Sequence, residues 1–572
     1  MLAMAALKAN SQVTSSSITG TVMDSAGNYL EGATITATHT PSGTVYTTLS
    51  RKGGVFVIPS ARIGGPYTIK VDYVGYKSYQ VDGITLILGE PYNINAVMGE
   101  EFKDLASVVV TVQRRKSAVD KTGASTNVGQ RQITSLPTIS RSITDFTRLT
   151  PQANGTSFGG RDARYNNVQV DGANLNNNFG LSSDLLPGGG NQPISLDAIE
   201  ELSINIAPYD VRQAGFTGAG VNAVTKSGTN TLKGTAYAYY RDQSFNGTRV
   251  GDTKLPEQQK EKNQIYGMTL GGPIIKNKLF FFVSGELEER TFPGINWSPS
   301  GGSGKGQESN TPIDSLRKLS EFLKSQYGYD TGPYDNFPDF KAKNHKILGK
   351  IDWNINNVHK LTLKYNELVS NNDVALNATS VPNGLAGAIG YSSTQRFGRN
   401  AMSFANSNYG FKDVVRNGTL ELNSNFGGRF ANQFLVTMTK IKATRTSPSE
   451  VFPFIDILNN NNNNYMSAGY EPYSYNNDVI NDVYSIINNF SYFAGRHRVT
   501  AGVSYEYQRV GNMFMPASQS YYVFNSLDDF INNRAPKGFA LTYSLVPGKE
   551  SVYSAELKLG QLGLYVQDEI TF

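Results

Sequence analysis

Residues 215–230 read GFTGAGVNAVTKSGTN, and residues 231–241 continue as TLKGTAYAYYR. The first stretch is rich in glycine, weakly apolar, and ends in a polar turn sequence at residues 227–230. From residue 231 onward, apolar and polar residues alternate almost to the end of the chain, which is the period of a β-strand. The switch predicts a boundary between a compact unit and a long series of β-strands.

Length and composition narrow the class of protein. A chain of 572 residues exceeds what one core usually supports, so several domains are expected. The net charge is only +5 and the Lys and Arg residues are spread along the chain, which argues against a nucleic-acid partner. The 32 Tyr, 29 Phe and 57 Gly favour an aromatic, turn-rich β protein.

Cysteine and histidine give no sign of catalytic or metal chemistry. The chain has no Cys, which excludes disulfides and thiolate metal sites, and its four His lie far apart. None of them falls in an HxxE or HExxH pattern, so a zinc hydrolase is not expected. We therefore expect no enzyme, no metal site and no cofactor.

The N-terminus bears on localisation. Residues 1–12, MLAMAALKANSQ, resemble the tail of a signal peptide with a cleavage site before Gln12, so residues 1–15 are interpreted as its remnant. A basic n-region and a full apolar core are missing, which leaves a truncated start, an internal Met1 or an ordinary terminus. No run approaches the roughly 20 apolar residues of a membrane helix.

Residues 16–103 predict a small β-sandwich. Short strands at residues 18–22, 33–37, 54–58 and 67–73 are separated by Gly, Pro and Asn turn signals. The segment GTVMDSAGNYLEGATITA, followed by YTIKVDYVGYKSY, resembles the carboxypeptidase-regulatory-like domain. That resemblance implies a carbohydrate-binding-like, prealbumin-like fold without catalytic residues.

Residues 104–230 predict a compact α+β unit. Alternation is broken here, and Gly, Asn, Asp and Ser are frequent. Residues 140–149 favour a helix between Pro137 and Pro151, with an apolar face that includes Phe146. Strands are expected at residues 167–171 and 201–205.

Residues 231–572 predict the strands of a membrane barrel. Eleven segments of about ten residues alternate; in residues 346–355, Lys346 and Lys350 oppose Ile347 and Ile351. A Lys at mid-bilayer on the lipid face costs about 2–4 kcal/mol, so the charged sets are expected to face the lumen.

The links between these segments alternate short and long. Short links are expected near residues 272–278, 356–360, 427–429, 494–496 and 560–561, and long links at residues 242–262, 289–344, 369–414, 443–482 and 509–550. Transmembrane barrels have short periplasmic turns and long external loops. A soluble β-repeat protein or adhesin is the alternative, but loops beyond about 15 residues are uncommon in soluble domains.

Three segments carry a second resemblance. RSITDFTRLTPQ (residues 141–152), GGRDARYNNVQVDGANLNN (159–177) and ISLDAIEELSINIAPYDVRQAGFTGAGVNAVTKSGTN (194–230) resemble the plug domain of TonB-dependent receptors. The preceding sandwich is similar to the Oar-like and SusC-like branch of the Bacteroidota. Such receptors imply a 22-strand barrel with a plugged lumen. We therefore expect a fragment with about half of the barrel and with a last strand that lacks its neighbour.

The resemblance also implies function and partners. It implies a transporter in the outer membrane of a Gram-negative bacterium, with the sandwich and plug facing the periplasm, that takes up a glycan, peptide or chelate. The implied partners are the TonB–ExbB–ExbD complex, outer-membrane lipid, a small ligand and a SusD-like surface lipoprotein. A non-transporting Oar-like surface protein for adhesion or export is the alternative.

The segment at residues 105–112 resembles the TonB box, the extended motif that receptors present to TonB. A β-prone segment can add to the edge of a partner's sheet, where main-chain hydrogen bonds provide affinity. The candidate residues are Val108, Val109, Val110, Thr111 and Val112. A last sandwich strand or a first plug strand is the alternative interpretation.

Candidate gating residues lie in the family's plug motif, namely Arg161, Arg164, Tyr165, Asn166, Asp171 and Gly172. The arginines are expected to pair with lumen carboxylates such as Glu286, Asp352 or Glu421, or else to be solvated. The Asp171–Gly172 pair is a turn signal. The plug–barrel junction is assigned to Gly215, Gly218, Gly220 and Gly228.

Two remaining segments are expected to be loops. Residues 301–306, GGSGKG, lack the Ser/Thr of a phosphate loop, and the Asn run at residues 459–464 has low complexity. The loop aromatics Trp297, Tyr465, Tyr470 and Tyr473 are candidates for stacking on sugars.

Overall fold

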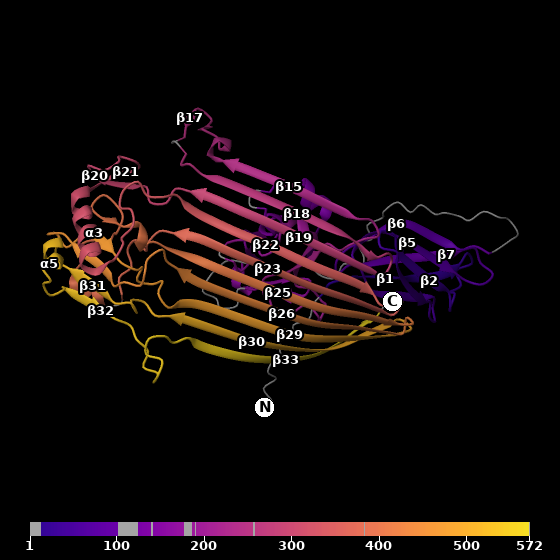
Figure 1. Ribbon diagram of the computed structural model, residues 1–572. Helices are drawn as coiled ribbons and strands as arrows, with labels where there is room; N and C mark the ends of the chain where they lie inside the picture. Colours follow the sequence, from indigo (N-terminus) through magenta and orange to yellow (C-terminus); the bar gives the residue numbers. More distant parts are fainter. Residues whose placement is uncertain are drawn as a thin grey trace.

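The computed structural model describes residues 13–100, 124–138, 141–176, 186–188, 190–255, 258–382 and 384–570. They form a small two-sheet sandwich, a compact α+β unit and a broad sheet of long strands, with further structure at one end of that sheet (Figure 1). Among the described residues, no helix is long and apolar enough to cross a membrane.

The sandwich has two sheets around an apolar core, as predicted. Their strand orders are β4-β1-β7 and β3-β2-β5-β6. The strands are β1 (Ser16–Asp24), β2 (Thr34–His39), β3 (Thr44–Leu49), β4 (Val55–Ala61), β5 (Gly64–Asp72), β6 (Tyr79–Leu86) and β7 (Pro91–Met98). Alternate side chains point inward, and this leaves Ile18, Ile35, Phe56, Tyr67 and Ile69 fully buried.

The described residues between 124 and 230, named the plug unit below, lie behind the long strands in Figure 1. A five-stranded sheet has the order β12-β11-β14-β13-β8. The elements are β8 (Ala124–Gly129), α1 (Gln130–Ser135), α2 (Thr144–Thr147), β9 (Ala153–Asn154), β10 (Ser157–Phe158), η1 (Ala163–Tyr165), β11 (Asn167–Val170), β12 (Ala173–Asn174), η2 (Leu196–Ala198), β13 (Ile199–Ile206) and β14 (Gly220–Thr225).

The helix expected at residues 140–149 is much shorter in the structure. Only α2 is helical, because Arg141 has a φ of 50°, outside the right-handed helical region. Ile143 and Phe146 are buried as the apolar face predicted, but Leu149 is 40% exposed. The core of the plug unit also includes Phe282, Leu348, Leu368 and Val415 of the long strands.

The long strands form one antiparallel sheet in sequence order, named the barrel sheet. The strands are β15 (Lys233–Asp242), β18 (Lys262–Ile275), β19 (Leu279–Phe292), β22 (Phe340–Asn354), β23 (His359–Val374), β25 (Tyr409–Phe426), β26 (Phe430–Thr446), β29 (Asn477–Ala494), β30 (His497–Phe514) and β33 (Ala555–Ile570). In the described part of the chain, β15 and β33 are its two edges, so the barrel is not closed.

In the part of the chain that the structure describes, the barrel sheet has ten strands, and the expected number of eleven is wrong. The turn predicted at residues 560–561 does not form, because β33 runs through it while paired with β30, with Gly560 opposite Tyr507 and Gln561 opposite Glu506. The Tyr505 hydroxyl lies 3.2 Å from where a Cβ on Gly560 would be. The glycine thus leaves room for a cross-strand tyrosine instead of marking a turn.

The two faces of the barrel sheet differ as the alternation predicts. Lys346 and Lys350 are 7% and 6% exposed on the side of the plug unit, whereas Ile347 and Ile351 are 47% and 42% exposed on the other side. Apolar side chains on the outer face suit contact with lipid, and polar side chains on the inner face suit a lumen.

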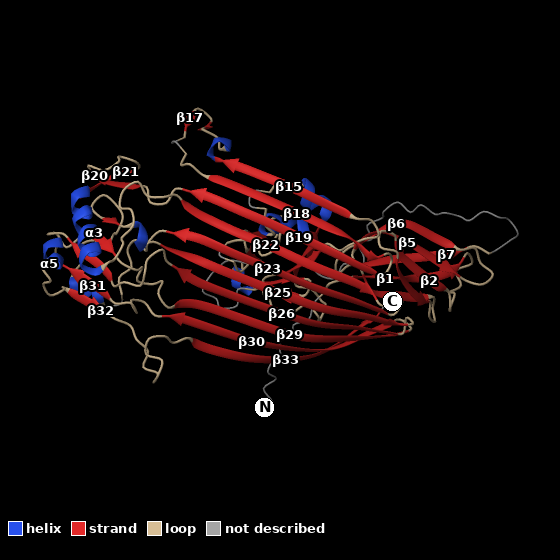
Figure 2. Ribbon diagram, in the orientation of Figure 1, coloured by secondary structure: helices blue, strands red, loops and turns tan. Residues whose placement is uncertain are grey.

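The long links fold into a separate structure, named the cap, at the end of the barrel sheet opposite the sandwich (Figures 1 and 2). Three different links contribute to its sheet, of order β24-β28-β27-β31-β32. Its elements are β20 (Trp297–Ser300), β21 (Gln307–Pro312), α3 (Ile313–Tyr327), α4 (Leu385–Ile389), β24 (Met402–Ser403), η4 (Ala405–Ser407), β27 (Phe454–Leu458), β28 (Asn464–Ala468), β31 (Tyr521–Phe524), α5 (Leu527–Ile531) and β32 (Gly538–Ala540).

The first long link differs from the others and carries only η3 (Gln243–Phe245), β16 (Arg249–Val250) and β17 (Thr253–Lys254). In the cap, Leu316, Leu319 and Leu323 of α3 are fully buried in its core. Trp297 and Tyr465 pack against the same core, and Tyr470 is only 9% exposed. Several aromatics proposed as sugar-stacking residues therefore contribute to the packing of the cap.

Candidate functional site: the interface between plug unit and barrel sheet

A tight hairpin brings a carboxylate of the plug unit to the barrel sheet. Asp171 and Gly172 connect β11 to β12 with φ values of 44° and 82°. Positive φ at both central residues is the geometry of a type I′ hairpin, which Asp-Gly favours. The Asp171 side chain is consequently held against β22 and β23.

Asp171 lies between two lysines of the barrel sheet, and we name this group the Asp171 cluster. Its carboxylate oxygens lie 3.7 Å from Lys350 Nζ and 3.3 Å from Lys364 Nζ. Thr225 of the plug unit donates to the same carboxylate from its backbone N at 2.9 Å and its hydroxyl at 2.6 Å. Lys364 also donates to Val170 O at 2.8 Å.

The cluster is buried, and the Asp171 carboxyl is ionised. Burial by itself raises the pKa of Asp171, but Lys350, Lys364 and the two Thr225 hydrogen bonds outweigh it and lower the pKa to about 2. All three charged side chains are less than 10% exposed. Removing one partner of such a buried group leaves an uncompensated charge, which costs about 3–5 kcal/mol.

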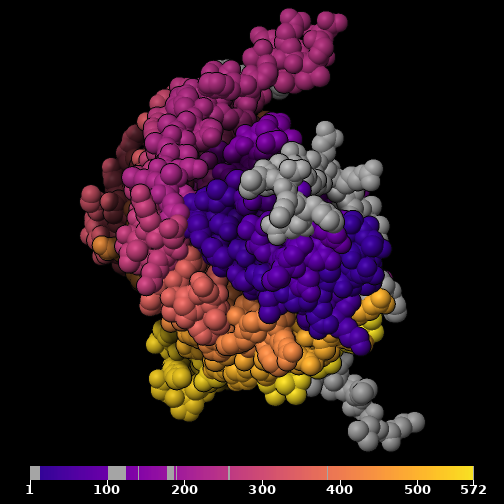
Figure 3. All heavy atoms as spheres, turned by 90° about the vertical axis from the view of Figure 1, so that its right-hand side faces the viewer, coloured from indigo at the N-terminus to yellow at the C-terminus, as the bar shows by residue number. Residues whose placement is uncertain are grey.

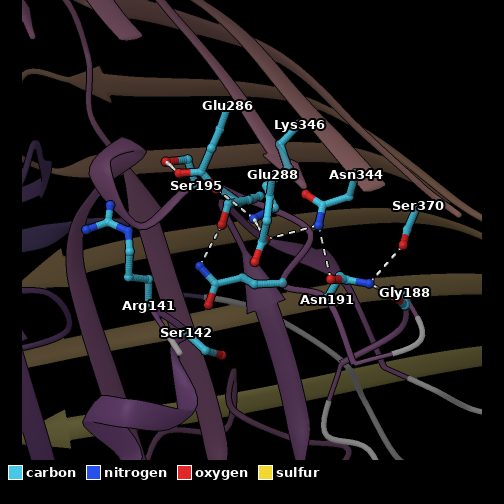
Figure 4. Close-up of polar contacts among 12 residues, drawn as sticks. Arg141, Ser142, Gly188, Asn191, Ser195, Glu286, Glu288, Asn344, Lys346 and Ser370 are labelled. Atoms are coloured by element: carbon cyan, nitrogen blue, oxygen red, sulfur yellow. Dashed lines mark hydrogen bonds and ion pairs between the residues drawn. The ribbon is translucent and has the colours of Figure 1, made fainter. Parts of the chain in front are cut away.

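A second polar group, the Glu286 cluster, joins the plug unit to β15, β19 and β22 (Figure 4). Lys346 Nζ lies 2.6 Å from Glu286 Oε1. The Ser195 hydroxyl of the plug unit and the Tyr237 hydroxyl of β15 both donate to Glu286 Oε2 at 2.8 Å. Glu286 is 5% exposed, and three donors satisfy its charge.

Asn191 of the plug unit extends this contact along the barrel sheet. Its amide donates to Ser370 Oγ at 2.8 Å, and its carbonyl oxygen accepts from Asn344 Nδ2 at 3.1 Å (Figure 4). Asn344 also donates to Glu288 at 3.0 Å. The two contacts of Asn191 itself are neutral hydrogen bonds, which water can replace at modest cost.

Arg141 is the plug arginine that faces the barrel sheet near Glu286. Its guanidinium forms an ion pair with Asp197 and lies 4.0 Å from the ring centroid of Tyr239. Arg141 was not among the predicted gating residues, although its place at the start of the RSITDF motif was a usable signal.

The arginines predicted to pair with lumen carboxylates lie elsewhere. Arg161 and Arg164 are exposed, and Arg164 forms an ion pair with Asp162 at 2.8 Å. The three proposed carboxylates have other partners: Lys346 for Glu286, Thr362 for Asp352, and Gln433 for Glu421. The expected polarity is reversed at Asp171, where the plug unit supplies the anion.

The other plug candidates differ in burial. Tyr165 is 55% exposed. Asn166 is buried, accepting from Ala219 N at 2.9 Å and donating to Thr156 O at 2.9 Å. This amide bridges η1 to the start of β14, which is a structural contact within the plug unit.

The junction glycines permit close approaches. A Cβ on Gly218 would lie 2.2 Å from Asn166 Oδ1, and one on Gly228 would lie 2.4 Å from Phe281 O of β19. Gly220 faces the Phe216 ring, and Gly215 has a φ of 83°. At Gly228 the chain therefore passes directly against the barrel backbone.

Two further predictions concern the TonB box and a metal site. Val108, Val109, Val110, Thr111 and Val112 lie outside the described residues. Within the described ranges, no group of three or more His, Asp or Glu side chains could hold a metal ion.

Comparison with known proteins supports this organisation. Residues 17–99 match the carboxypeptidase regulatory-like domain, and residues 224–295 match an outer membrane beta barrel domain. The TonB-dependent transporter Oar of Myxococcus xanthus is 27% identical over 290 residues, which are 47% of this chain and 26% of Oar. The chain thus spans about a quarter of this relative's length.

A solved structure has a similar fold. The outer membrane transporter YddB from Escherichia coli aligns with a TM-score of 0.53 at 13% identity, over 78% of this chain and 54% of that chain. The domain matches and the similarity to Oar support a TonB-dependent receptor of the Gram-negative outer membrane, and YddB shares the fold of this chain.

Proposed function

We propose that this chain belongs to an active transporter, in which the plug unit closes the barrel lumen until TonB pulls on it. The observation that carries this proposal is the interface just described. Two buried ionic clusters and the neutral hydrogen bonds of Asn191 join the plug unit to the inner face of the barrel sheet. Such contacts hold a closed state, yet water can replace each of them once the plug unit moves.

The coupling segment is proposed to be residues 105–112, with Val108, Val109, Val110, Thr111 and Val112 adding as a strand to TonB. TonB would be driven by ExbB and ExbD. The sandwich and plug unit would face the periplasm, and the cap would face the outside. The ligand is proposed to be a glycan, a peptide or a chelate, delivered with or without a SusD-like lipoprotein, and no covalent chemistry is involved.

A non-transporting surface protein for adhesion or export is the second candidate. The folded cap favours it, because an apolar core and a five-stranded sheet present a stable surface and not a set of flexible loops. Transport and adhesion differ in their need for TonB.

The deciding experiment changes the coupling segment in cells that express the protein. Growth on a panel of glycans, peptides and iron chelates first identifies a nutrient whose use requires the protein. Val110→Pro removes a backbone donor and prevents strand addition. Val110→Ile keeps the backbone donor and permits strand addition, so it is the matched control. We expect Val110→Pro to abolish growth on that nutrient while an epitope in the cap stays displayed. Growth that is insensitive to the protein and to Val110→Pro contradicts transport and favours adhesion.

A further inference from the structure

The sandwich covers the end of the barrel sheet at which the short turns lie. Figure 3 looks onto this end and shows the sandwich, in indigo, inside the arc formed by the barrel strands. Four successive turns take part. Gly43 approaches Asn277 after β18, Thr44 contacts Asn354 before the next turn, Thr48 faces Gly428, and Val57 packs on Phe493.

Polar contacts fix the position of the sandwich on these turns. Asn354 Nδ2 donates to Thr44 Oγ1 at 2.9 Å, and Lys360 Nζ lies 4.5 Å from the ring centroid of Tyr46. Gly428 approaches so closely that a Cβ on it would lie 2.2 Å from Thr48 Oγ1. Adjacent turns of one rigid sheet therefore hold a single face of the sandwich.

The sandwich also contacts the plug unit. Arg62 donates from both terminal nitrogens to Gly228 O at 3.3 Å, at the point where the plug unit joins the barrel sheet. Val13, Ile63 and Leu88 of the sandwich region form a small apolar cluster with Val224 of β14. The sandwich is thus docked onto both parts that border the lumen.

A cavity of about 390 Å³ separates the sandwich from the plug unit and the inner face of the barrel sheet. All three parts line it, with Arg62 and Tyr46 from the sandwich, Lys226 from the plug unit, and Asp352 and Lys360 from the barrel sheet. Charged groups of both signs line the space, and they can hold water or a small polar solute. It has the plug unit on one side and the sandwich on the other.

We propose that the sandwich is a second gate, in series with the plug unit, that closes the periplasmic exit of the lumen. The proposal rests on the transport function argued above and adds a step to it. A solute that passes the plug unit enters this cavity and leaves only after the sandwich separates from the short turns. Two closures in series keep the outer membrane tight while either one is open.

The first test measures whether the sandwich is docked in the resting protein. The chain has no Cys, so single introduced thiols report their own positions. Thr48 is 2% exposed at the docking face, whereas Val97 is 51% exposed on β7 of the same sandwich. We expect the Thr48→Cys variant to react at least tenfold more slowly with a polar maleimide than the Val97→Cys variant. Equal rates in the purified full-length protein overturn docking.

The second test measures whether docking closes the exit. Thr44→Cys with Asn354→Cys joins two side chains that are in contact and fastens the sandwich to the barrel sheet. Thr36→Cys with Thr47→Cys joins paired positions of β2 and β3, so it is a matched disulfide within the sandwich alone. KCl conductance of the full-length protein is recorded in planar bilayers, in urea that releases the plug unit.

We expect oxidation of the 44–354 pair to lower this conductance at least tenfold, reduction to restore it, and the 36–47 pair to have no redox effect. Equal conductance in the two redox states of the 44–354 pair, whatever its size, overturns the second gate. The measurement uses neither TonB nor a proton gradient. A failure of the proposed transport function therefore leaves its outcome unchanged.

Discussion

The two ends of the barrel sheet are closed in physically different ways. At the long-link end, the cap has its own apolar core and a five-stranded sheet built from three links. At the short-turn end, the sandwich folds around its own core and contacts the barrel sheet largely through polar pairs. The plug unit adds buried ionic contacts to a core that it shares with apolar side chains of the barrel sheet. Apolar contacts within one core break together when that core unfolds. Polar pairs across an interface can instead be exchanged one at a time for hydrogen bonds to water.

This difference separates permanent structure from releasable structure. The cap is expected to behave as one body, because its links share a core and cannot move independently. The sandwich is expected to detach without unfolding, because its core stays intact when interface contacts break. Release of the plug unit also separates its core from apolar side chains of the barrel sheet. Four substitutions examine this distinction, beginning with the largest expected effect.

The largest effect is expected from Arg396→Met in the cap. Arg396 and Asp456 are both fully buried, and Arg396 donates to Asp456 Oδ1 at 3.2 Å and Oδ2 at 3.1 Å. The substitution leaves the buried Asp456 carboxylate without its cationic partner, so the free energy of unfolding of the cap is expected to fall by about 3–5 kcal/mol. Fluorescence of Trp297 during urea unfolding reports it, in a Trp353→Phe background.

Arg317→Met is the matched control for the cap. Arg317 pairs with Asp314 on the surface of α3 at 2.8 Å, with both side chains at least half exposed. Such pairs contribute about 0.3–0.5 kcal/mol. A cap that loses no more stability from Arg396→Met than from Arg317→Met would not be a single body.

The next effect is expected from Asp171→Asn in the plug unit. The change leaves Lys350 and Lys364 facing each other without their anion, although each keeps a carbonyl acceptor. We expect the free energy required to release the plug unit to fall by about 3 kcal/mol. Protease cleavage of the plug loops should then begin at a lower urea concentration. Adding Lys364→Met should recover part of the loss. Asp162→Asn, in the exposed pair with Arg164, is expected to change little.

A smaller, pH-dependent effect is expected at Glu201, which links the plug unit to the sandwich. Glu201 Oε1 accepts from Leu88 N at 3.0 Å. Burial raises the pKa of Glu201 to about 7, opposed by the Leu88 hydrogen bond and assisted by Glu200 and Glu90. The folded state thus holds a proton that the unfolded chain has lost above its ordinary value of 4.5, and stability falls as the pH rises from about 4.5 through 7.

Glu201→Gln keeps the acceptor and removes the charge. At pH 8 the variant is expected to be about 2 kcal/mol more stable than the natural protein, and at pH 4 the two should be equal. Urea midpoints at the two pH values provide the comparison. An advantage of Glu201→Gln that does not grow between pH 4 and pH 8 would contradict a neutral, buried carboxyl.

The barrel sheet could largely be predicted from the sequence, because alternation is a local signal. Its strand number could not, since Gly560 and Gln561 resemble a turn until their pairing with β30 is known. The cap could not be predicted from the sequence for the same reason. Its sheet pairs residues from different links, such as Phe454 with Tyr521, and no local pattern announces such a contact.

The gating contacts were only partly predictable. Asp171 and Gly172 signal a hairpin locally, but the lysines that face Asp171 depend on the register of β22 and β23. Arg161 and Arg164 follow the family motif, yet Asp162 lies nearer in sequence and takes Arg164 as its partner. Charge type alone cannot choose among partners that only the fold brings together.

The smallest effect is expected from Arg62→Met, which weakens the sandwich at the Gly228 contact. The two donors reach Gly228 O at 3.3 Å, a long hydrogen bond from a charged group, so the loss is expected to be about 1 kcal/mol. The apolar cluster with Val224 remains, and the sandwich itself should stay folded. The maleimide rate of the Thr48→Cys variant should then rise about fivefold, while Arg131→Met, on the exposed face of α1, leaves it unchanged. A rate that does not respond to Arg62→Met would place the docking energy in the apolar contacts, and the short-turn end would then resemble the cap more than the polar interface inferred here.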